Sequence, residues 1–316
     1  MTSKEFYIIN YQFDPKIPLF FRPYWLNAVC GAANWHIILY PDTHNVEAFF
    51  IYYKKEKLGF SYIVNPPFTP YTGLWIFNEN YKSNSQALSY YNKVVSYFIL
   101  QLPKVSFLSF KLHPRFESWL PFFWSNFKQS TMYTNELYAI SEIGKFPGYF
   151  EYNKRKQIQK AEKNLIVKFN LNAADFYNHH KSSLLQQKKS ILYPATLLDK
   201  ICNVSEKHSC GFTIYIVDLQ NNIHAALLVV WDKYAAYALI SSIHPEYKKS
   251  GAGDLVFYRA IGHAVSFTNT FNFEGSMLCN VAKSFQKFNP ELLPYHYLYK
   301  INNPILKFVN NLKPLV

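Results

Sequence analysis

A strand, a glycine-bearing loop and a helix follow one another between residues 234 and 264, and this order constrains the fold more than any other feature. The apolar run over residues 234–242 is typical of a buried strand, and apolar positions after the loop recur at helical spacing. Gly251 and Gly253 allow close approach to the backbone, and a helix start favours an anion. Asp254 is unfavourable there, because its carboxylate would repel a phosphate unless it capped the helix. The segment therefore predicts an anion site, although two glycines after a strand are also typical of a plain tight turn.

The composition allows two globular domains. The chain has 316 residues, and domains of about 150 residues are common. Hydrophobic residues make up 49% and charged residues 17%, which supplies a sizeable core and argues against disorder. The formal charge of +13 favours polyanionic partners such as nucleic acid, anionic lipid or phosphate-bearing metabolites. Lysine used as ordinary surface filler explains the same charge.

The four cysteines and the N-terminal segment indicate the cellular compartment in which the protein is expected. The cysteines have long, irregular spacings without a Cys-x-x-Cys pair, so free thiols are expected rather than a metal site. The first residues lack the pattern of a signal peptide, and no apolar run reaches about 18 residues. We therefore expect a cytoplasmic protein without a transmembrane segment and without a metal.

The order of predicted elements repeats in two halves, residues 1–145 and 146–316. Each half is predicted to contain a helix, three strands, a special loop, and then helix, strand, helix and strand. This order predicts an α/β protein with mixed (α+β), mostly antiparallel sheets and helices on both faces. Pro66, Pro67 and Pro70 stand where the second half has its glycine loop, and proline has no N–H for a phosphate. The first domain is therefore expected to bind the acceptor and the second the donor, with one active site between them.

Two resemblances to known proteins sharpen this expectation. The spacing Lys248-x-x-Gly251-x-Gly253 resembles the pyrophosphate loop of GNAT acyltransferases, Gln/Arg-x-x-Gly-x-Gly/Ala, with lysine at the first position. Five stretches in matching order resemble the Fem-type group (FemA, FemB, FemX) of peptidoglycan aminoacyltransferases: residues 21–29, 66–75, 113–121, 152–163 and 273–277. The resemblance implies two tandem GNAT-like domains that transfer an acyl or aminoacyl group to an amine. In the better-known members the donor is aminoacyl-tRNA and the acceptor is the peptide of a cell-wall precursor.

Two groups of residues are candidates for holding phosphate. The loop is expected to bind the donor phosphate through six consecutive residues: Lys248, Lys249, Ser250, Gly251, Ala252 and Gly253. A helix predicted over residues 150–164 brings Lys156, Lys160 and Lys163 to one face, beside Arg155. This face fits a clamp for acceptor or tRNA phosphates, and equally a solvated helix surface.

Acyl transfer to an amine needs a proton acceptor, an oriented donor and stabilisation of the oxyanion. Glu274 follows a predicted strand and is the best-placed carboxylate to accept a proton or orient the acceptor, or else it anchors a turn. Lys283 is a candidate to neutralise the oxyanion. Tyr258 loosely resembles the tyrosine acid of some GNAT enzymes, with core packing as its alternative. No Ser/His/Asp or Cys/His nucleophile is apparent, so direct attack by the amine is expected.

In the first half, Trp25 and Tyr71 belong to aromatic segments that suit an acceptor groove and equally an aromatic core. The sequence thus predicts a transferase that moves an aminoacyl or acyl group to an amine of a phosphate-bearing cell-envelope precursor. Its donor would be aminoacyl-tRNA or acyl-CoA. Two alternatives stay open: an acyl-CoA-dependent N-acyltransferase acting on a sugar or lipid precursor, and a non-catalytic nucleic-acid-binding protein on a GNAT scaffold.

Overall fold

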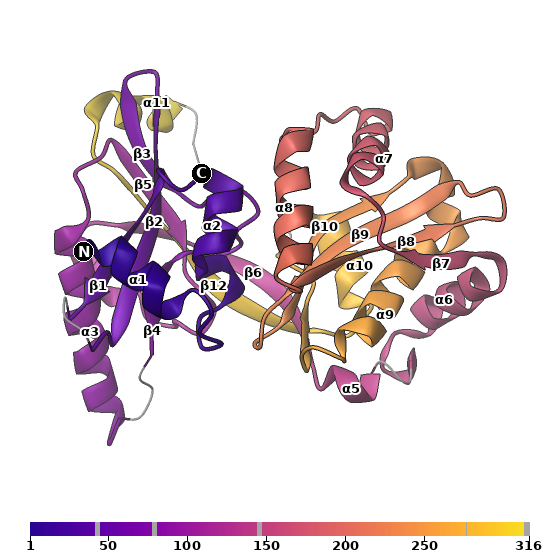
Figure 1. Ribbon diagram of the computed structural model, residues 1–316, viewed down its shortest axis with the longest axis horizontal. Coiled ribbons are helices and arrows are strands. Elements are labelled where there is room, and N and C mark those ends of the chain that lie inside the picture. Colours follow the sequence, from indigo (N-terminus) through magenta and orange to yellow (C-terminus); the bar gives the residue numbers. More distant parts are fainter. Residues whose placement is uncertain (42–44, 78–80, 144–146, 276, 313–316) are drawn as a thin grey trace. The chain divides into compact units, whose positions relative to one another are not determined.

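A computed structural model of the chain describes residues 1–41, 45–77, 81–143, 147–275 and 277–312. The chain divides into two compact units, whose elements are labelled in Figure 1. The first unit comprises residues 1–132 together with residues 294–316, and the second comprises residues 133–293.

This division differs from the predicted boundary between residues 145 and 146 for two reasons. Strand β6 (Lys128–Tyr138) reaches into the second unit, where it pairs with β11 (Thr270–Asn272). Strand β12 (Glu291–Ile301) brings the end of the chain back to the first unit, where it pairs with β5 (Phe107–Lys111). Such long-range pairings leave no local signal in the sequence.

The first unit is built around the strand order β1-β2-β3-β5-β12, with β4 paired to β2. Its pairs are antiparallel except for β3 and β5. The remaining strands are β1 (Trp35–Tyr40), β2 (Ala48–Lys57), β3 (Phe60–Val64) and β4 (Gly73–Ile76). The helices are α1 (Ser3–Tyr11), η1 (Leu19–Phe21), α2 (Pro23–Cys30), α3 (Asn84–Gln101), α4 (Leu120–Trp124) and α11 (Pro304–Leu312).

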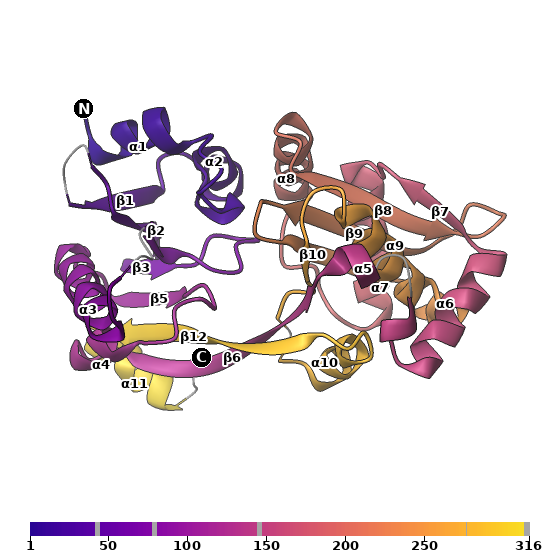
Figure 2. The same ribbon diagram turned by 90° about the horizontal axis from the view of Figure 1, so that it is seen from below.

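Aromatic side chains fill both faces of this sheet. Phe49 and Phe50 are neighbours on β2 and therefore point to opposite faces. The Phe49 ring lies 5.1 Å from that of Tyr7 on α1, and the Phe50 ring lies 5.8 Å from that of Phe98 on α3. Figure 2 shows α1 and α3 on opposite sides of the sheet. Much of the high aromatic content thus serves as core of the first unit.

The second unit has the strand order β6-β11-β10-β9-β8-β7. Its pairs are antiparallel except for β10 and β11, which are parallel. The strands not yet given are β7 (Ile166–Phe169), β8 (Gly211–Val217), β9 (Ile223–Trp231) and β10 (Ala236–Ile243). The helices are α5 (Ile140–Ile143), η2 (Pro147–Tyr149), α6 (Tyr152–Asn164), α7 (Ala173–Gln186), α8 (Ala195–Lys207), η3 (Pro245–Ser250), α9 (Ala252–Ala264) and α10 (Cys279–Gln286).

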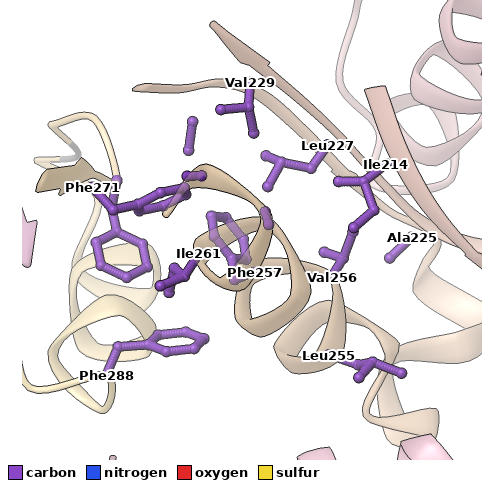
Figure 3. Packing of buried hydrophobic residues seen from close by; sticks show 14 of the residues in the cluster. Ile214, Ala225, Leu227, Val229, Leu255, Val256, Phe257, Ile261, Phe271 and Phe288 are labelled. Atoms are coloured by element: carbon purple, nitrogen blue, oxygen red, sulfur yellow. The ribbon is translucent and has the colours of Figure 1, made fainter. Parts of the chain in front are cut away.

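Helix α9 is the central helix of the second unit. It buries Val256, Phe257 and Ile261 against strand residues that include Leu227 and Val229 of β9, as Figure 3 shows. Helix α7 packs on β10 and α8 on β8, and Ser242 of β10 bonds to α7. The predicted strand, loop and helix between residues 234 and 264 are therefore all present, as β10, η3 and α9.

Two properties of the described residues bear on partners. None of the described helices combines the length and apolar character needed to cross a bilayer. Within the same residues, no group of three or more His, Cys, Asp or Glu side chains is arranged to hold a metal ion.

Candidate active site

Strands β10 and β11 separate after a very short ladder of residue pairs. They pair only as Ala236 with Phe271 and Tyr237 with Asn272, whereas β10 runs on to Ile243. A bulge interrupts β10 just beyond the last pair, where Leu239 is the extra residue between Ala238 and Ile240 in the register with β9. In the part of the chain that the structure describes, one edge of β10 beyond Tyr237 has no neighbouring strand. Backbone N–H groups along this opening can donate hydrogen bonds to the carbonyl oxygen of an acyl group or to an oxyanion.

The side chain of Asn272 organises the β11 side of this opening. It is buried, and its Oδ1 accepts hydrogen bonds from Thr134 Oγ1 at 2.8 Å and from the Glu274 backbone N–H at 2.7 Å. Its Nδ2 donates to Glu136 Oε1 at 2.7 Å. Asn272 therefore links β6, β11 and the start of the following loop into one polar network.

Glu136 is a carboxylate that the sequence motifs did not identify. It is half-buried, and its second oxygen, Oε2, accepts a hydrogen bond from the Tyr138 hydroxyl at 2.8 Å. Burial raises the pKa of Glu136, while the hydrogen bonds from Tyr138 and Asn272 lower it and the charge of Glu291 adds to the rise. The only sequence signal was the alternation of polar Thr134, Glu136 and Tyr138 along one strand.

Glu274, the carboxylate singled out in the sequence, lies two residues beyond Asn272. Its φ of 62° is a left-handed backbone conformation that side chains other than glycine rarely adopt. The hydrogen bond from its N–H to Asn272 Oδ1 stabilises that conformation. The structure thus brings Glu274 and Glu136 to the same network, and the catalytic role of Glu274 stays a prediction.

The predicted donor loop forms η3 and the start of α9. Lys248 and Lys249 are exposed at the end of η3, and Gly251 precedes α9 with a left-handed φ of 82°. The Ala252 N–H bonds to Ser250 Oγ at 3.2 Å. All six predicted loop residues therefore lie together at a helix N-terminus.

The two glycines of the loop have neighbours inside the protein. A Cβ atom on Gly251 would lie 2.6 Å from the Gln157 carbonyl oxygen of α6 and 3.2 Å from Ala161 Cβ. A Cβ atom on Gly253 would lie 2.7 Å from Ile243 Cδ1 of β10. The packing of α6 and β10 on the loop is thus sufficient reason for glycine at both positions.

Asp254 is neutralised by a lysine that the sequence did not mark out. Lys154 Nζ lies 2.5 Å from Asp254 Oδ1, and the Lys154 side chain is only 3% exposed. Burial lowers the pKa of Lys154, and the charge of Asp254 opposes that effect. Asp254 makes no side-chain cap of α9; it pairs with α6 instead.

The predicted phosphate ligands of helix α6 lie on the side of the helix opposite to Lys154. Lys156, Lys160 and Lys163 are exposed, while the buried face carries Ile158 and Ala161 together with Lys154. Arg155 is half-buried, and its Nε is buried without a hydrogen-bond partner among the described residues. The lysine row is therefore accessible to a polyanion.

Four other candidates lie on other elements. Tyr258 lies on α9 near Phe150 and Arg259, on the side of β7, and three strands separate β7 from β11. Lys283 is exposed on α10. Trp25 and Tyr71 are buried in the first unit, where Trp25 donates to Thr69 Oγ1 and the Tyr71 ring contacts that of His113. The roles given to these four residues stay predictions.

Comparisons with known proteins agree with this geometry. Residues 150–271 match the family model described as an acetyltransferase (GNAT) domain. The crystal structure of FemX has a TM-score of 0.69 at 11% identity, covering 99% of this chain and 98% of that one. L-PGS from Bacillus licheniformis has a TM-score of 0.53 at 10% identity, covering 92% of each chain. The C-terminal domain of a putative lysylphosphatidylglycerol synthetase from Agrobacterium fabrum has a TM-score of 0.53 at 8% identity, covering 88% of each chain. A search of curated proteins finds no match.

The GNAT domain match at residues 150–271 supports an acyltransferase. The predicted α/β fold class with GNAT-like domains is confirmed, and so is the resemblance to FemX at the level of the fold.

Gly251→Ala should destabilise the protein more than Gly59→Ala does. Both glycines have a positive φ, but the Gly59 position has no atom within 4 Å of an added Cβ. Gly59→Ala should therefore cost only backbone strain, about 1 kcal/mol. Gly251→Ala must also displace α6, which raises the cost to roughly 3 kcal/mol. Urea denaturation midpoints measure the difference, and equal losses would contradict the proposed contact with α6.

Lys154→Met should destabilise the protein by on the order of 3 kcal/mol, because it leaves Asp254 without its partner. The double variant with Asp254→Asn should recover part of that loss, since no unpaired charge remains. Lys156→Met on the exposed face of α6 is the matched control and should change the free energy of unfolding by less than about 0.5 kcal/mol. An equal effect of Lys154→Met and Lys156→Met would refute the role of the ion pair.

Proposed function

We propose that the protein transfers an aminoacyl or acyl group to an amine on a phosphate-bearing cell-envelope precursor. The observation that carries this proposal is the opening between β10 and β11, beside the bulge at Leu239. An aminoacyl or acyl group placed there would lie along the backbone edge of β10 that has no neighbouring strand among the described residues. Its carbonyl oxygen would accept hydrogen bonds from backbone N–H groups as negative charge develops on that oxygen.

The reaction in this opening is a direct displacement. The nitrogen of the acceptor amine attacks the carbonyl carbon, and the bond between that carbon and the donor oxygen or sulfur breaks. The amine loses one proton to a carboxylate, Glu136 or Glu274, and the departing oxygen or sulfur takes up one proton, so that the donor leaves as an alcohol or a thiol. Glu136 is the better placed of the two carboxylates for this, because Asn272 and Tyr138 fix both of its oxygens. Asn272 acts on Glu274 as a positioning residue through its backbone bond.

Two features favour aminoacyl-tRNA over acyl-CoA as the donor. Protein packing already explains both loop glycines, so their pattern is weak support for a bound pyrophosphate. The exposed lysines of η3 and α6 provide a wide positive surface, which suits the backbone of an RNA. The acyl-CoA donor is favoured by the GNAT domain match at residues 150–271, and it is the second candidate.

The acceptor class follows from the Fem resemblance and from charge. Arg155 and the lysine row of α6 would hold a phosphate of the acceptor or of the donor RNA. One of the similar structures is described as a putative lysylphosphatidylglycerol synthetase, and that name combines an amino acid with a phosphate-bearing lipid. A phosphate-bearing precursor with a free amine is therefore the first acceptor to test.

The proposal is tested by transfer of label. Purified protein is incubated with tRNA charged with radiolabelled amino acids, or separately with radiolabelled acetyl-CoA, and with a nucleotide-linked muramyl peptide as the acceptor. Label from charged tRNA in the peptide would support the proposal, and label from acetyl-CoA would establish the second candidate. Absence of label from both donors, with muramyl peptide and with amine-bearing phospholipid, would leave the non-catalytic binding protein as the better account.

Glu136→Gln should lower the transfer rate by about 100-fold or more and change its pH dependence. A general base must be deprotonated, and burial raises the pKa of Glu136. The wild-type rate should therefore fall as the pH falls toward that raised pKa, above the ordinary glutamate value of about 4.3. The variant should lack this acidic limb.

The matched variant is Glu274→Gln, which changes the carboxylate of the residue whose backbone N–H bonds to Asn272. If Glu136 is the base, Glu274→Gln should keep the acidic limb. Loss of that limb in Glu274→Gln and its retention in Glu136→Gln would reverse the two roles.

A further inference from the structure

A recess lies in the second unit, between the edge strand β7 and helix α9. It has a volume of about 570 Å³ and is lined by Val167, Phe169, Tyr258, Arg259, Gly262 and His263. This volume is within the range of small-molecule sites. Neither the opening between β10 and β11 nor the glycine loop contributes to its lining.

The walls of the recess are largely aromatic. Phe169 on β7 is 39% exposed although it is a large apolar side chain at a sheet edge. The His263 ring lies 4.8 Å from the Phe169 ring and 4.6 Å from the Phe212 ring. Burial lowers the pKa of His263, which favours the neutral ring, and a neutral imidazole can both donate and accept a hydrogen bond. A flat heteroaromatic group matches such walls.

The rim of the recess carries an arginine that is paired with a carboxylate. Arg259 Nη2 lies 2.8 Å from Glu162 Oε1 of α6, and the Arg259 side chain is 49% exposed. Among the described residues this is the ion pair of Arg259, and it leaves other N–H groups of the guanidinium available for an anion. Glu162 is next to Lys163, the last residue of the exposed lysine row on α6. An aromatic slot, an oriented arginine and a lysine row therefore follow one another across α9 and α6.

We propose that this recess binds a nucleotide, with the base against Phe169 and Tyr258 and a phosphate at Arg259. Aromatic side chains bind bases through their faces, and arginine binds phosphate through paired N–H groups. A purely apolar ligand would make no contact with the remaining N–H groups of the guanidinium. The nucleotide is either part of an RNA strand or a free nucleotide such as the adenosine diphosphate portion of CoA.

The place of the recess suits a part of the donor that does not react. Tyr258 is seven residues along α9 from Gly251, roughly 10 Å at the rise of an α-helix. Assignment of the nucleotide to the donor rests on the proposed function, whereas the binding itself is measured without any transfer.

The experiment titrates the full-length protein with ADP and, separately, with single-stranded oligoadenylate of about eight nucleotides, a length that fits one binding site. Calorimetry gives the affinity for each. Phe169→Ala and Arg259→Gln should each weaken ADP binding by about tenfold, as expected for loss of one stacking or phosphate contact.

Two matched controls lie on the other face of β7. Ile166→Ala changes an apolar side chain of similar exposure, 42%, and Lys168→Gln removes a positive charge. Neither should change ADP affinity. Lack of saturable binding of both probes, or equal weakening by Phe169→Ala and Ile166→Ala, would overturn the proposal.

The two probes separate the sources of the nucleotide. Tighter binding of the oligoadenylate, reduced by the double change Lys160→Gln and Lys163→Gln, would assign the recess to RNA. Equal affinity for both probes, without effect of the lysine changes, would assign it to a free nucleotide. Transfer of label that is insensitive to Phe169→Ala and Arg259→Gln would reject the recess while leaving the proposed function intact. Nucleotide binding without any transfer of label would support the recess and reject the proposed function.

Discussion

The contact between α6 and the first turn of α9 is the constraint on which the candidate site depends. Gly251 lies directly under the Gln157 carbonyl, and the buried Lys154 is paired with Asp254 one turn away. A charged pair of this kind is tolerated inside a protein only when both partners stay in place. The pair also neutralises the negative charge of Asp254 at the start of α9, where the helix dipole attracts an anion. The contact thus fixes the loop and sets its electrostatic character at once.

The opening between β10 and β11 needs a different kind of support. Two strands that separate after two residue pairs lose the hydrogen bonds that would hold them. On one side α9 supplies the rigidity through its buried apolar residues, and on the other Asn272 ties β11 to β6 and to Glu274. The polar network therefore supports the strands and also positions a carboxylate. A carboxylate in such a network is held at a fixed position without a covalent restraint.

The sequence predicted what local periodicity and spacing encode. The elements β10, η3 and α9 follow the predicted strand, loop and helix, and α6 follows the predicted helix over residues 150–164. Residues whose importance comes from distant partners were not found. Glu136 and Asn272 are 136 residues apart and meet only because β6 pairs with β11. Lys154 looked like one more lysine of a basic helix, since only the packing of α6 shows which lysine is buried.

The glycine loop illustrates how one pattern has two physical causes. Glycine is required wherever an atom approaches the backbone closely, and the pattern does not say whether that atom belongs to a ligand or to the protein. Here Gln157 of α6 and Ile243 of β10 make the close approaches. A chain that used the loop mainly to seat a helix would be free to replace the first Gln or Arg of the GNAT pattern, and this chain has Lys248 there. The departure from the pattern and the packing of α6 thus have one explanation, which also accounts for an acidic residue at position 254.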